Sequence, residues 1–434
     1  FDAPRPLRTR PSSARGWCGG LGMLRCFGLR GGGFGSAAAA KAVSQKELDA
    51  AAAEVSAEVA PWDGARTAVV RDLQAAVRNH GQVQLVRDAE GRLIAVKRMP
   101  TAWVRADAAD FERHYPAASE RPWADLAFLR LLREREYAYT CRLHGVFRSD
   151  TETFVAMSFC SEGDLFDWCH SDSVPSPGPR REERVRPVAA QLLAAVRWLH
   201  DLGIAHRDLS LENVVLTRHG AEASLRLIDF GMATLQRYVR DEIRGKLVYQ
   251  APEVHTQRVV DAFLADNFAV GAILYCMAAQ DYPWTCTERG KCQLFEYYCR
   301  FGLQRFMSKR RVRRGKGQYL LDVLSTDYVE VLEGLLHFQP RKRTSLGESA
   351  FVNEVRIVHR RPSIWDTDLF RAAEPRPQPP TPTHRTGGGQ ALCQDHAELV
   401  TPHDSTSTCS AVSGGSVPSE LLLSDRAPLV ASAA

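Results

Sequence analysis

The residues best suited to chemistry stand in a short polar run, HRDLSLEN, at 206–213. Three further motifs accompany it in order along the chain: IAVK at 94–97, DFG at 229–231 and APE at 251–253. Each motif occurs by chance in many proteins. Together they offer an ammonium group for polyanionic phosphates, a carboxylate that can take up a hydroxyl proton, and hard oxygen ligands for Mg²⁺. These groups are the parts that phosphoryl transfer requires.

The hydrophobic pattern indicates which elements must position these groups. Strands are expected between residues 69 and 98, and they place Lys97 on the third strand. Beyond Asp125 helices dominate, most clearly at 188–200 and 268–279. The chain is therefore expected to be an α+β protein.

In these motifs and their order the chain resembles the eukaryotic-type protein kinases, with a serine/threonine kinase-like catalytic domain. The resemblance implies a bilobal fold, with a small mainly-β N-lobe at 67–158 and a large mainly-α C-lobe at 159–361. Residues 1–66 are expected to be a low-complexity arm with a short Ala-rich helix, which either packs on the next domain or stands alone. Residues 362–434 are expected to be a disordered Pro/Ser/Thr-rich tail.

The same resemblance implies roles for the motif residues, with ATP and Mg²⁺ as cofactors. Lys97 would hold the nucleotide phosphates. Asp208 would orient the attacking hydroxyl and take up its proton. Asn213 and Asp229 would bind Mg²⁺. The other nucleotide-binding positions are Gly81, Val83, Ala95, Met157, Ser158, Cys160 and Asp164.

Three of these positions have a more specific expected place. Met157 would lie at the back of the pocket, and Ser158 to Cys160 would form the hinge whose backbone reads adenine. Asp164 would contact the ribose or the substrate, and it could also cap the helix that begins near Leu165.

Structural roles follow from the resemblance as well. Asp266 would hold the catalytic-loop backbone from below, and Arg343 would pair with Glu253.

The chain departs from the family pattern at the glycine-rich loop. Ala76 and Arg78 occupy two of the three glycine places, and Gly81 occupies the third. Cβ atoms at the first two places hinder close approach of the backbone to phosphate, so weak or unusual nucleotide binding is expected.

A second departure concerns the acidic partner of Lys97. Asp125 stands where the family has a glutamate, and Glu120 is the alternative partner. The 28-residue separation of Asp125 from Lys97 also predicts an insertion near residues 105–121.

Two positions near the catalytic loop are exchanged relative to the family. Ser210 replaces the usual loop lysine, and Lys246 stands where the activation segment normally has threonine. We expect Lys246 to reach the vacated place from the opposite wall as a catalytic residue, because lysine acts on phosphate as a flexible point charge. The alternative is that Lys246 points to solvent.

Arg207 normally pairs with a phosphate on the activation segment, and Glu242 stands nine residues before Ala251, at about that place. A carboxylate there could pair with Arg207 without phosphorylation. The alternative is a solvated acidic loop.

Composition restricts the class of protein. The 434 residues carry a net charge of +5, which does not indicate a cationic nucleic-acid binder. Eleven cysteines without a C-x-x-C pair fit no zinc pattern and indicate reduced thiols in an intracellular, cytoplasmic protein. No apolar run reaches the roughly 18–20 residues that span a bilayer, and the uncharged stretch 267–280 is expected to be a buried helix.

Targeting stays open at this stage. Residues 1–41 hold seven basic residues and one acid, which fits a disordered arm or part of an organellar transit peptide. The chain begins with Phe1 instead of methionine, so we expect that residues before it are missing.

The expected function is transfer of the ATP γ-phosphoryl group to Ser or Thr of a protein substrate, because the catalytic loop lacks the form seen in tyrosine-specific kinases. The alternative is a pseudokinase that binds nucleotide or acts as a scaffold, supported by the glycine loop, Asp125 and Ser210. A basic run at 309–316 is a solvated loop, a site for acidic partners, or a nuclear address or polyanion contact.

Overall fold

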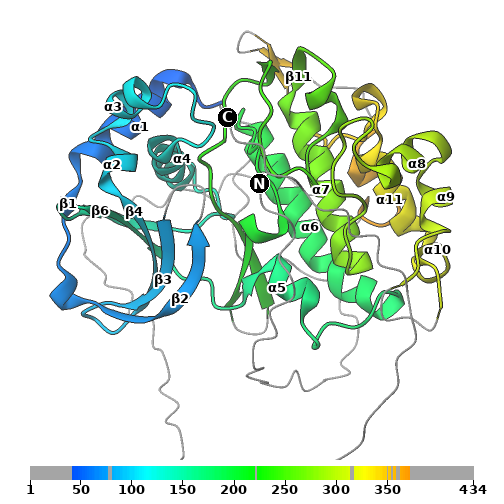
Figure 1. Cartoon of the computed structure of the whole chain (residues 1–434), viewed down its shortest axis with the longest axis horizontal. Coiled ribbons are helices and arrows are strands. Elements are labelled where there is room, and N and C mark those ends of the chain that lie inside the picture. Colours follow the sequence, from blue (N-terminus) through cyan, green and yellow to red (C-terminus); the bar gives the residue numbers. More distant parts are fainter. Residues whose placement is uncertain are drawn as a thin grey trace, which may run out of the picture. The chain divides into compact units, whose positions relative to one another are not determined.

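The computed structural model describes residues 42–76, 81–219, 222–312, 317–348, 350–352, 355–357 and 362–371. The arm before residue 42 and the tail after residue 371, both expected to be disordered, lie outside these residues. Within them a mainly-β lobe precedes a mainly helical lobe (Figure 1). This arrangement confirms the α+β, bilobal prediction.

The small lobe is built on one six-stranded sheet that is antiparallel except where β1 joins its edge. In sheet order its strands are β1 (Ala60–Pro61), β5 (Leu143–Arg148), β6 (Glu152–Ser158), β4 (Leu93–Pro100), β3 (Gly81–Arg87) and β2 (Ala68–Ala76). Lys97 lies on β4, which is the fourth strand because the unexpected strand β1 precedes the others.

Four helices accompany this sheet: α1 (Gln45–Ala57), α2 (Thr101–Val104), α3 (Ala108–His114) and α4 (Pro122–Glu134). Helix α3 lies within the insertion expected near residues 105–121, and α2 comes immediately before it. Phe111 of α3 and Trp123 of α4 are buried in one apolar cluster with Val146 of the sheet. This cluster fixes α4 against the sheet, and α4 carries Asp125.

The large lobe is mainly helical. Its helices are α5 (Leu165–His170), α6 (Pro179–Asp201), α7 (Ala262–Ala279), α8 (Gln293–Phe301), α9 (Leu303–Met307), α10 (Leu320–Val323) and α11 (Thr326–Leu336). Its short strands are β7 (Gly163–Asp164), β8 (Val214–His219), β9 (Glu222–Leu227), β10 (Tyr238–Arg240), β11 (Val259–Asp261), β12 (Ala350–Val352) and β13 (Val355–Ile357).

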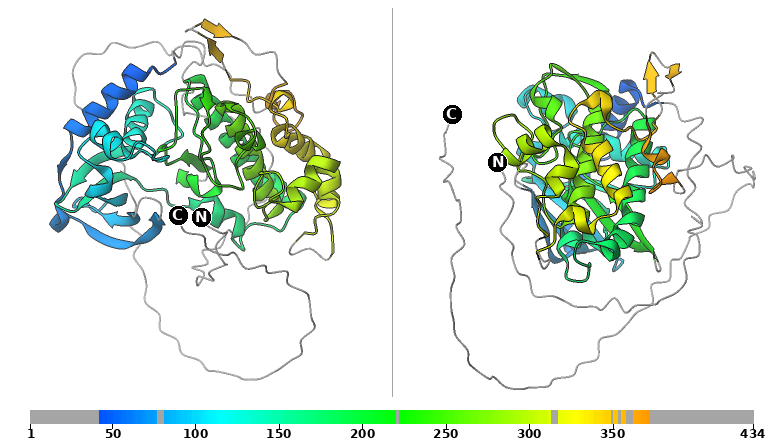
Figure 2. Two further views of the ribbon diagram at one scale, coloured as in Figure 1. Left: turned by 45° about the horizontal axis from the view of Figure 1, so that its top comes forward. Right: turned by 90° about the vertical axis from the view of Figure 1, so that its right-hand side faces the viewer.

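Helix α7 runs through the centre of the large lobe (Figures 1 and 2). By length and composition it could cross a membrane, but 94% of it is buried inside the protein. This confirms the buried helix expected at 267–280. A Cβ added to Gly271 would lie 2.9 Å from the Cβ of Leu335, so the absence of a side chain lets α7 and α11 pack closely.

The Ala-rich helix α1 packs on the small lobe, which was one of the two possibilities left open. Its capping box is present, with Ser44 accepting from the Glu47 backbone. Val55 is buried in the cluster that contains Trp123. Residues 45–61 therefore belong with the small lobe and not with a separate arm. Val43, just before α1, instead donates its backbone N–H to the Leu202 carbonyl of the large lobe at 2.9 Å. The Ala-rich composition predicted the helix but not the partner of its apolar face.

The expected start of the tail, at residue 362, is also corrected. Ile364, Trp365 and Phe370 are buried in the core of the large lobe. The indole of Trp365 donates to the Leu346 carbonyl at 2.7 Å. The large lobe thus continues to at least residue 370. The sequence did not predict this, because the apolar residues that are buried here stand among polar ones.

Candidate active site

The catalytic loop is held from below by helix α7. The Asp266 carboxylate accepts from the backbone N–H of His206 at 2.7 Å and of Arg207 at 2.9 Å. Asp266 is buried, so its two hydrogen bonds lie in a region of low dielectric, where they are stronger than in water. They fix the loop backbone to α7. The predicted role of Asp266 is confirmed.

Asp208 and Asn213 lie against one another within this loop. The Asn213 amide donates to the Asp208 carbonyl at 2.7 Å and to the Asp208 carboxylate at 3.2 Å. The backbone of Ile228, one residue before Asp229, donates to the Asn213 carbonyl at 3.1 Å. The loop and the DFG segment are thereby joined side by side.

Lys97 connects this region to the small lobe. Its ammonium group lies 3.8 Å from a Glu120 oxygen, 3.9 Å from an Asp125 oxygen and 3.8 Å from an Asp229 oxygen. Burial alone would lower the pKa of Lys97, but the three carboxylates outweigh it and raise the pKa above its ordinary value. A buried, permanently charged lysine therefore faces the site.

Both candidate partners of Lys97 are present together, so Glu120 and Asp125 need not be alternatives. Asp125 has an additional contact, because its carboxylate accepts from the Phe230 backbone N–H at 2.8 Å. Burial raises the pKa of Asp125 to about 6. Asp125 thus joins α4 to the DFG segment as well as to the lysine.

Several of the residues expected to bind nucleotide lie on β3, β4 and β6. Val83 pairs with Lys97 across β3 and β4, and Ala95 pairs with Met157 across β4 and β6. Gly81 pairs with Ala76 at the end of the β2–β3 hairpin. Arg78, with the other residues from 77 to 80, lies outside the described residues.

The residues expected to form the hinge, together with Asp164, lie at and after the end of β6. Ser158 ends β6, and its hydroxyl accepts from the Arg142 backbone at 2.9 Å. Cys160 lies in the connection that leads to β7. Asp164 caps α5 by accepting from the Asp167 N–H at 2.8 Å. Burial raises the pKa of Asp164 to about 6.

Comparison with known proteins now decides the family. The family model described as a protein kinase domain matches residues 79–353. The chain belongs to the protein kinase family.

Several curated kinases are similar over part of their length. CBL-interacting serine/threonine-protein kinase 3 of Arabidopsis thaliana is 31% identical over 165 residues, which cover 37% of this chain and 35% of that protein. Serine/threonine-protein kinase grp of Drosophila melanogaster is 30% identical over 220 residues, 48% of this chain and 38% of that protein. NUAK family SNF1-like kinase 2 of Rattus norvegicus is 26% identical over 212 residues, which cover 47% of this chain and 30% of that protein. The matched region spans about a third of the length of these relatives.

The kinase keeps the ion pair that anchors its APE segment. Arg343 is buried and makes a bidentate contact with Glu253, at 2.6 and 2.9 Å. This confirms the predicted pair, and the fork geometry makes it a specific link between the segment and the large lobe.

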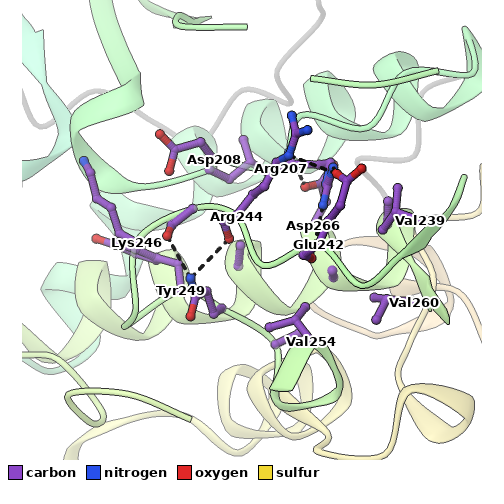
Figure 3. Close-up of a pocket in the computed structure, with 17 residues that line it drawn as sticks. Arg207, Asp208, Val239, Glu242, Arg244, Lys246, Tyr249, Val254, Val260 and Asp266 are labelled. Carbon is purple, nitrogen blue, oxygen red and sulfur yellow. Dashed lines mark hydrogen bonds and ion pairs between the residues drawn. The ribbon is translucent and has the colours of Figure 1, made fainter. Parts of the chain in front are cut away.

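The exchanged residues of this kinase face one another. The Lys246 ammonium donates to the Ser210 hydroxyl at 3.0 Å and lies 3.0 Å from a Glu212 oxygen. Lys246 and Asp208 extend toward the same side of the loop (Figure 3). Gly245, at φ +84°, permits this approach, because a Cβ there would lie 2.8 Å from the Arg207 carbonyl. Lys246 is therefore turned toward the catalytic loop and not toward solvent.

Arg207 pairs with the activation segment as predicted. Its guanidinium donates to Glu242 at 2.6 Å, and Arg244 lies 3.0 Å from the same carboxylate (Figure 3). Burial alone would raise the pKa of Glu242, but the hydrogen bond from Arg207 and the two positive charges lower it. Arg244 also donates to the Ser119 carbonyl at 3.1 Å, so the cluster reaches the small lobe.

Two functional contacts were missed by the sequence reasoning. Glu212 was read only as part of the loop motif, although it neutralises Lys246. Arg244 was not singled out, although it bridges Glu242 and Ser119. Alternating charges at 240–246 were the available signal, but the pattern does not say which charges meet.

Proposed function

We propose that the chain is an active protein kinase that transfers the γ-phosphoryl group of ATP to Ser or Thr hydroxyls of a protein substrate. The observation that carries the proposal is the assembly of Lys97, Asp229, Asn213 and Asp208 through successive contacts at one site. A nucleotide-binding scaffold would not need a carboxylate at Asp208, which here accepts a hydrogen bond from Asn213 at 3.2 Å.

The residues divide the work of transfer. Lys97 is charged and buried, so its positive charge is already in place for the phosphates and no reorganisation is needed during transfer. Asp208 would align the acceptor hydroxyl and take up its proton. Positioning of this kind supplies most of the catalysis in phosphoryl transfer.

The residues also fit Mg²⁺. The amide nitrogen of Asn213 donates to the Asp208 carbonyl, so the amide oxygen of Asn213 points away from that carbonyl and could bind a metal. The Asp229 carboxylate would be the second ligand. No group of three or more His, Cys, Asp or Glu side chains placed to hold a metal occurs within the described part of the chain. A two-ligand site suits Mg²⁺, which commonly completes its shell with substrate phosphates and water. Bound Mg²⁺ would neutralise charge on the phosphates.

Lys246 would take the place of the absent loop lysine. Its contact with Ser210 puts the ammonium at the side chain whose family counterpart carries the cation. The short Ser210 side chain leaves room for it. The pairing with Glu212 keeps the lysine oriented, and it would have to weaken for the ammonium to reach the transferred group.

Acceptor type rests on two supports. The loop 206–213 lacks the Ala-containing form of tyrosine-specific kinases. Two of the relatives also carry serine/threonine kinase in their names. Ser and Thr are therefore the proposed acceptors.

A nucleotide titration separates this proposal from a scaffold. The melting temperature of the chain is measured against ATP concentration, with Mg²⁺ and with EDTA. The active kinase should be stabilised by ATP more strongly when Mg²⁺ is present, since Asn213 and Asp229 gain their metal. An Asp229→Asn variant should lose that Mg²⁺ increment. Stabilisation by ATP that is indifferent to Mg²⁺ would favour the scaffold.

A further inference from the structure

Two cysteines meet beside the hinge. The Sγ atoms of Cys141 and Cys160 lie 3.6 Å apart, although the residues are 19 positions apart in sequence. Cys141 precedes β5 and Cys160 follows β6, and these strands are antiparallel neighbours. Arg142 and Ser158 are joined by a backbone hydrogen bond of 2.9 Å from Ser158 to Arg142. The continuation of this ladder places the two thiols side by side.

The pair is chemically uneven. Cys141 is buried and Cys160 is partly exposed. The contact with the Cys160 sulfur lowers the pKa of Cys141, although burial alone would raise it. The same contact, together with burial, raises the pKa of Cys160. Cys141 is therefore the better nucleophile, and Cys160 lies next to it as a resolving thiol.

Three thiols of the large lobe, Cys169, Cys276 and Cys299, differ from this pair. Cys292 does not differ in this way, because burial alone would raise its pKa but hydrogen bonds lower it. Burial raises the pKa of Cys169 to about 12 and raises that of Cys276 well above its ordinary value. Cys299 is partly exposed, and burial raises its pKa to about 11. These three are less suited to oxidation than the Cys141–Cys160 pair.

We propose that Cys141 and Cys160 form an oxidation site that peroxide closes into an intrachain disulfide, and that closure weakens nucleotide binding. The Cys141 thiolate attacks one oxygen of hydrogen peroxide, the O–O bond breaks, and a sulfenic acid forms while hydroxide leaves and is protonated to water. The Cys160 sulfur then attacks the Cys141 sulfur, the S–O bond breaks, and the second water leaves with the thiol proton. Two thiols and one peroxide give one disulfide and two waters.

The effect on nucleotide rests on the proposed function and on the expected hinge role of residues 158–160, whose backbone would bind adenine. A disulfide brings two sulfur atoms to about 2.05 Å, which is about 1.5 Å closer than the observed separation. Cys141 is anchored by burial, whereas Cys160 lies in a connection between strands. Closure therefore shifts mainly the hinge, and directional hydrogen bonds to adenine do not survive such a shift at full strength.

The test uses the full chain, treated with hydrogen peroxide and digested without reduction. Mass spectrometry should find a peptide in which Cys141 and Cys160 are linked, and dithiothreitol should remove the link. Cys141→Ser and Cys160→Ser should each abolish it, and Cys299→Ser should leave it intact. Absence of the linked peptide under conditions that oxidise Cys299 would overturn the proposal.

A second measurement follows binding of a fluorescent ATP analogue before and after oxidation. The oxidised protein should bind about tenfold more weakly, and Cys141→Ser, which cannot form the disulfide, should bind equally well before and after peroxide treatment. An oxidised, linked protein with unchanged affinity would overturn the regulatory part. If the reduced protein binds no nucleotide, the proposed function fails, whereas the linked peptide still decides whether the thiol pair reacts.

Discussion

The ammonium group of Lys246 lies 3.0 Å from the hydroxyl oxygen of Ser210, and each residue stands where the family has a different chemical type. The activation segment thus places a cation beside the catalytic loop, which lacks the lysine of the family. Mutations can therefore test whether Lys246 does the work of the family's loop lysine.

The exchange predicts a non-additive pair of mutations. Lys246→Thr should lower kcat at least about tenfold, because the transferring group loses a cation. Ser210→Lys combined with Lys246→Thr should recover much of kcat, since the cation returns to the loop. Steady-state kinetics of both variants test this. A kcat for Lys246→Thr within about threefold of wild type, less than about 0.7 kcal/mol of barrier, would show that the ammonium is not catalytic.

Glu212 supplies the control for that pair. If Lys246 serves only to neutralise Glu212, then Glu212→Gln should rescue Lys246→Thr. Our account predicts no rescue in the kcat of the double variant, because a neutral amide side chain cannot replace a cation at phosphate.

Asp125 and Glu120 should contribute unequally although they are equally near Lys97. Asp125→Ala also leaves the buried Phe230 N–H without its acceptor, a loss of about 1–3 kcal/mol in stability. It should lower both the melting temperature and kcat, the latter by more than about tenfold. Glu120→Ala should change kcat by less than about threefold. The opposite order would make Glu120 the functional partner of the lysine.

The Arg207–Glu242 pair predicts activity without phosphorylation of the activation segment. Phosphatase-treated protein from a bacterial host should be active, and Glu242→Ala should lower kcat about tenfold. Asp241→Ala is the matched control, because the Asp241 carboxylate pairs with the exposed Arg258, at 3.7 Å, and not with Arg207. Inactive protein that is rescued only by phosphorylation at Thr234 or Tyr238 would contradict this expectation.

Asp164 predicts a pH-dependent stability difference. Burial raises its pKa to about 6 from an ordinary 3.8, so the folded protein holds this proton more tightly than the unfolded chain. The resulting stability is complete below pH 3.8 and is lost as the pH rises through about 6. Asp164→Asn keeps a cap without the charge, so its melting temperature should exceed that of wild type at about pH 8. The advantage should shrink toward about pH 5, and an advantage that grows there would refute the assignment.

Much of the site could be predicted because its parts are short motifs with fixed spacing. Asp266, the Arg343–Glu253 pair and the Arg207–Glu242 pair were found in this way, since a kinase-like order places each motif in a known element. The contact of Lys246 with Ser210 was predicted from two differences from the family pattern. The loop lacks its lysine, and a lysine stands instead in the activation segment.

The remainder depended on long-range packing. The Ala-rich pattern of α1 predicted a helix but not its burial against α4, because apolar side chains specify a face and not its partner. Trp365 and Phe370 were assigned to the tail because few apolar residues surround them, yet two aromatic side chains can anchor a segment by burial alone. Of the basic run, residues 313–316 lie outside the described residues, and Arg310 is already paired with Asp281 at 2.7 Å.

Direct phosphoryl transfer tests the central claim most directly. The full chain is incubated with radiolabelled ATP, Mg²⁺ and a peptide library that presents Ser, Thr and Tyr, beside an Asp208→Asn variant of equal melting temperature. The account predicts label on Ser and Thr peptides from wild type and at least about a hundredfold less from the variant. Wild-type protein that binds ATP and transfers no label, or equal transfer by Asp208→Asn, would contradict it.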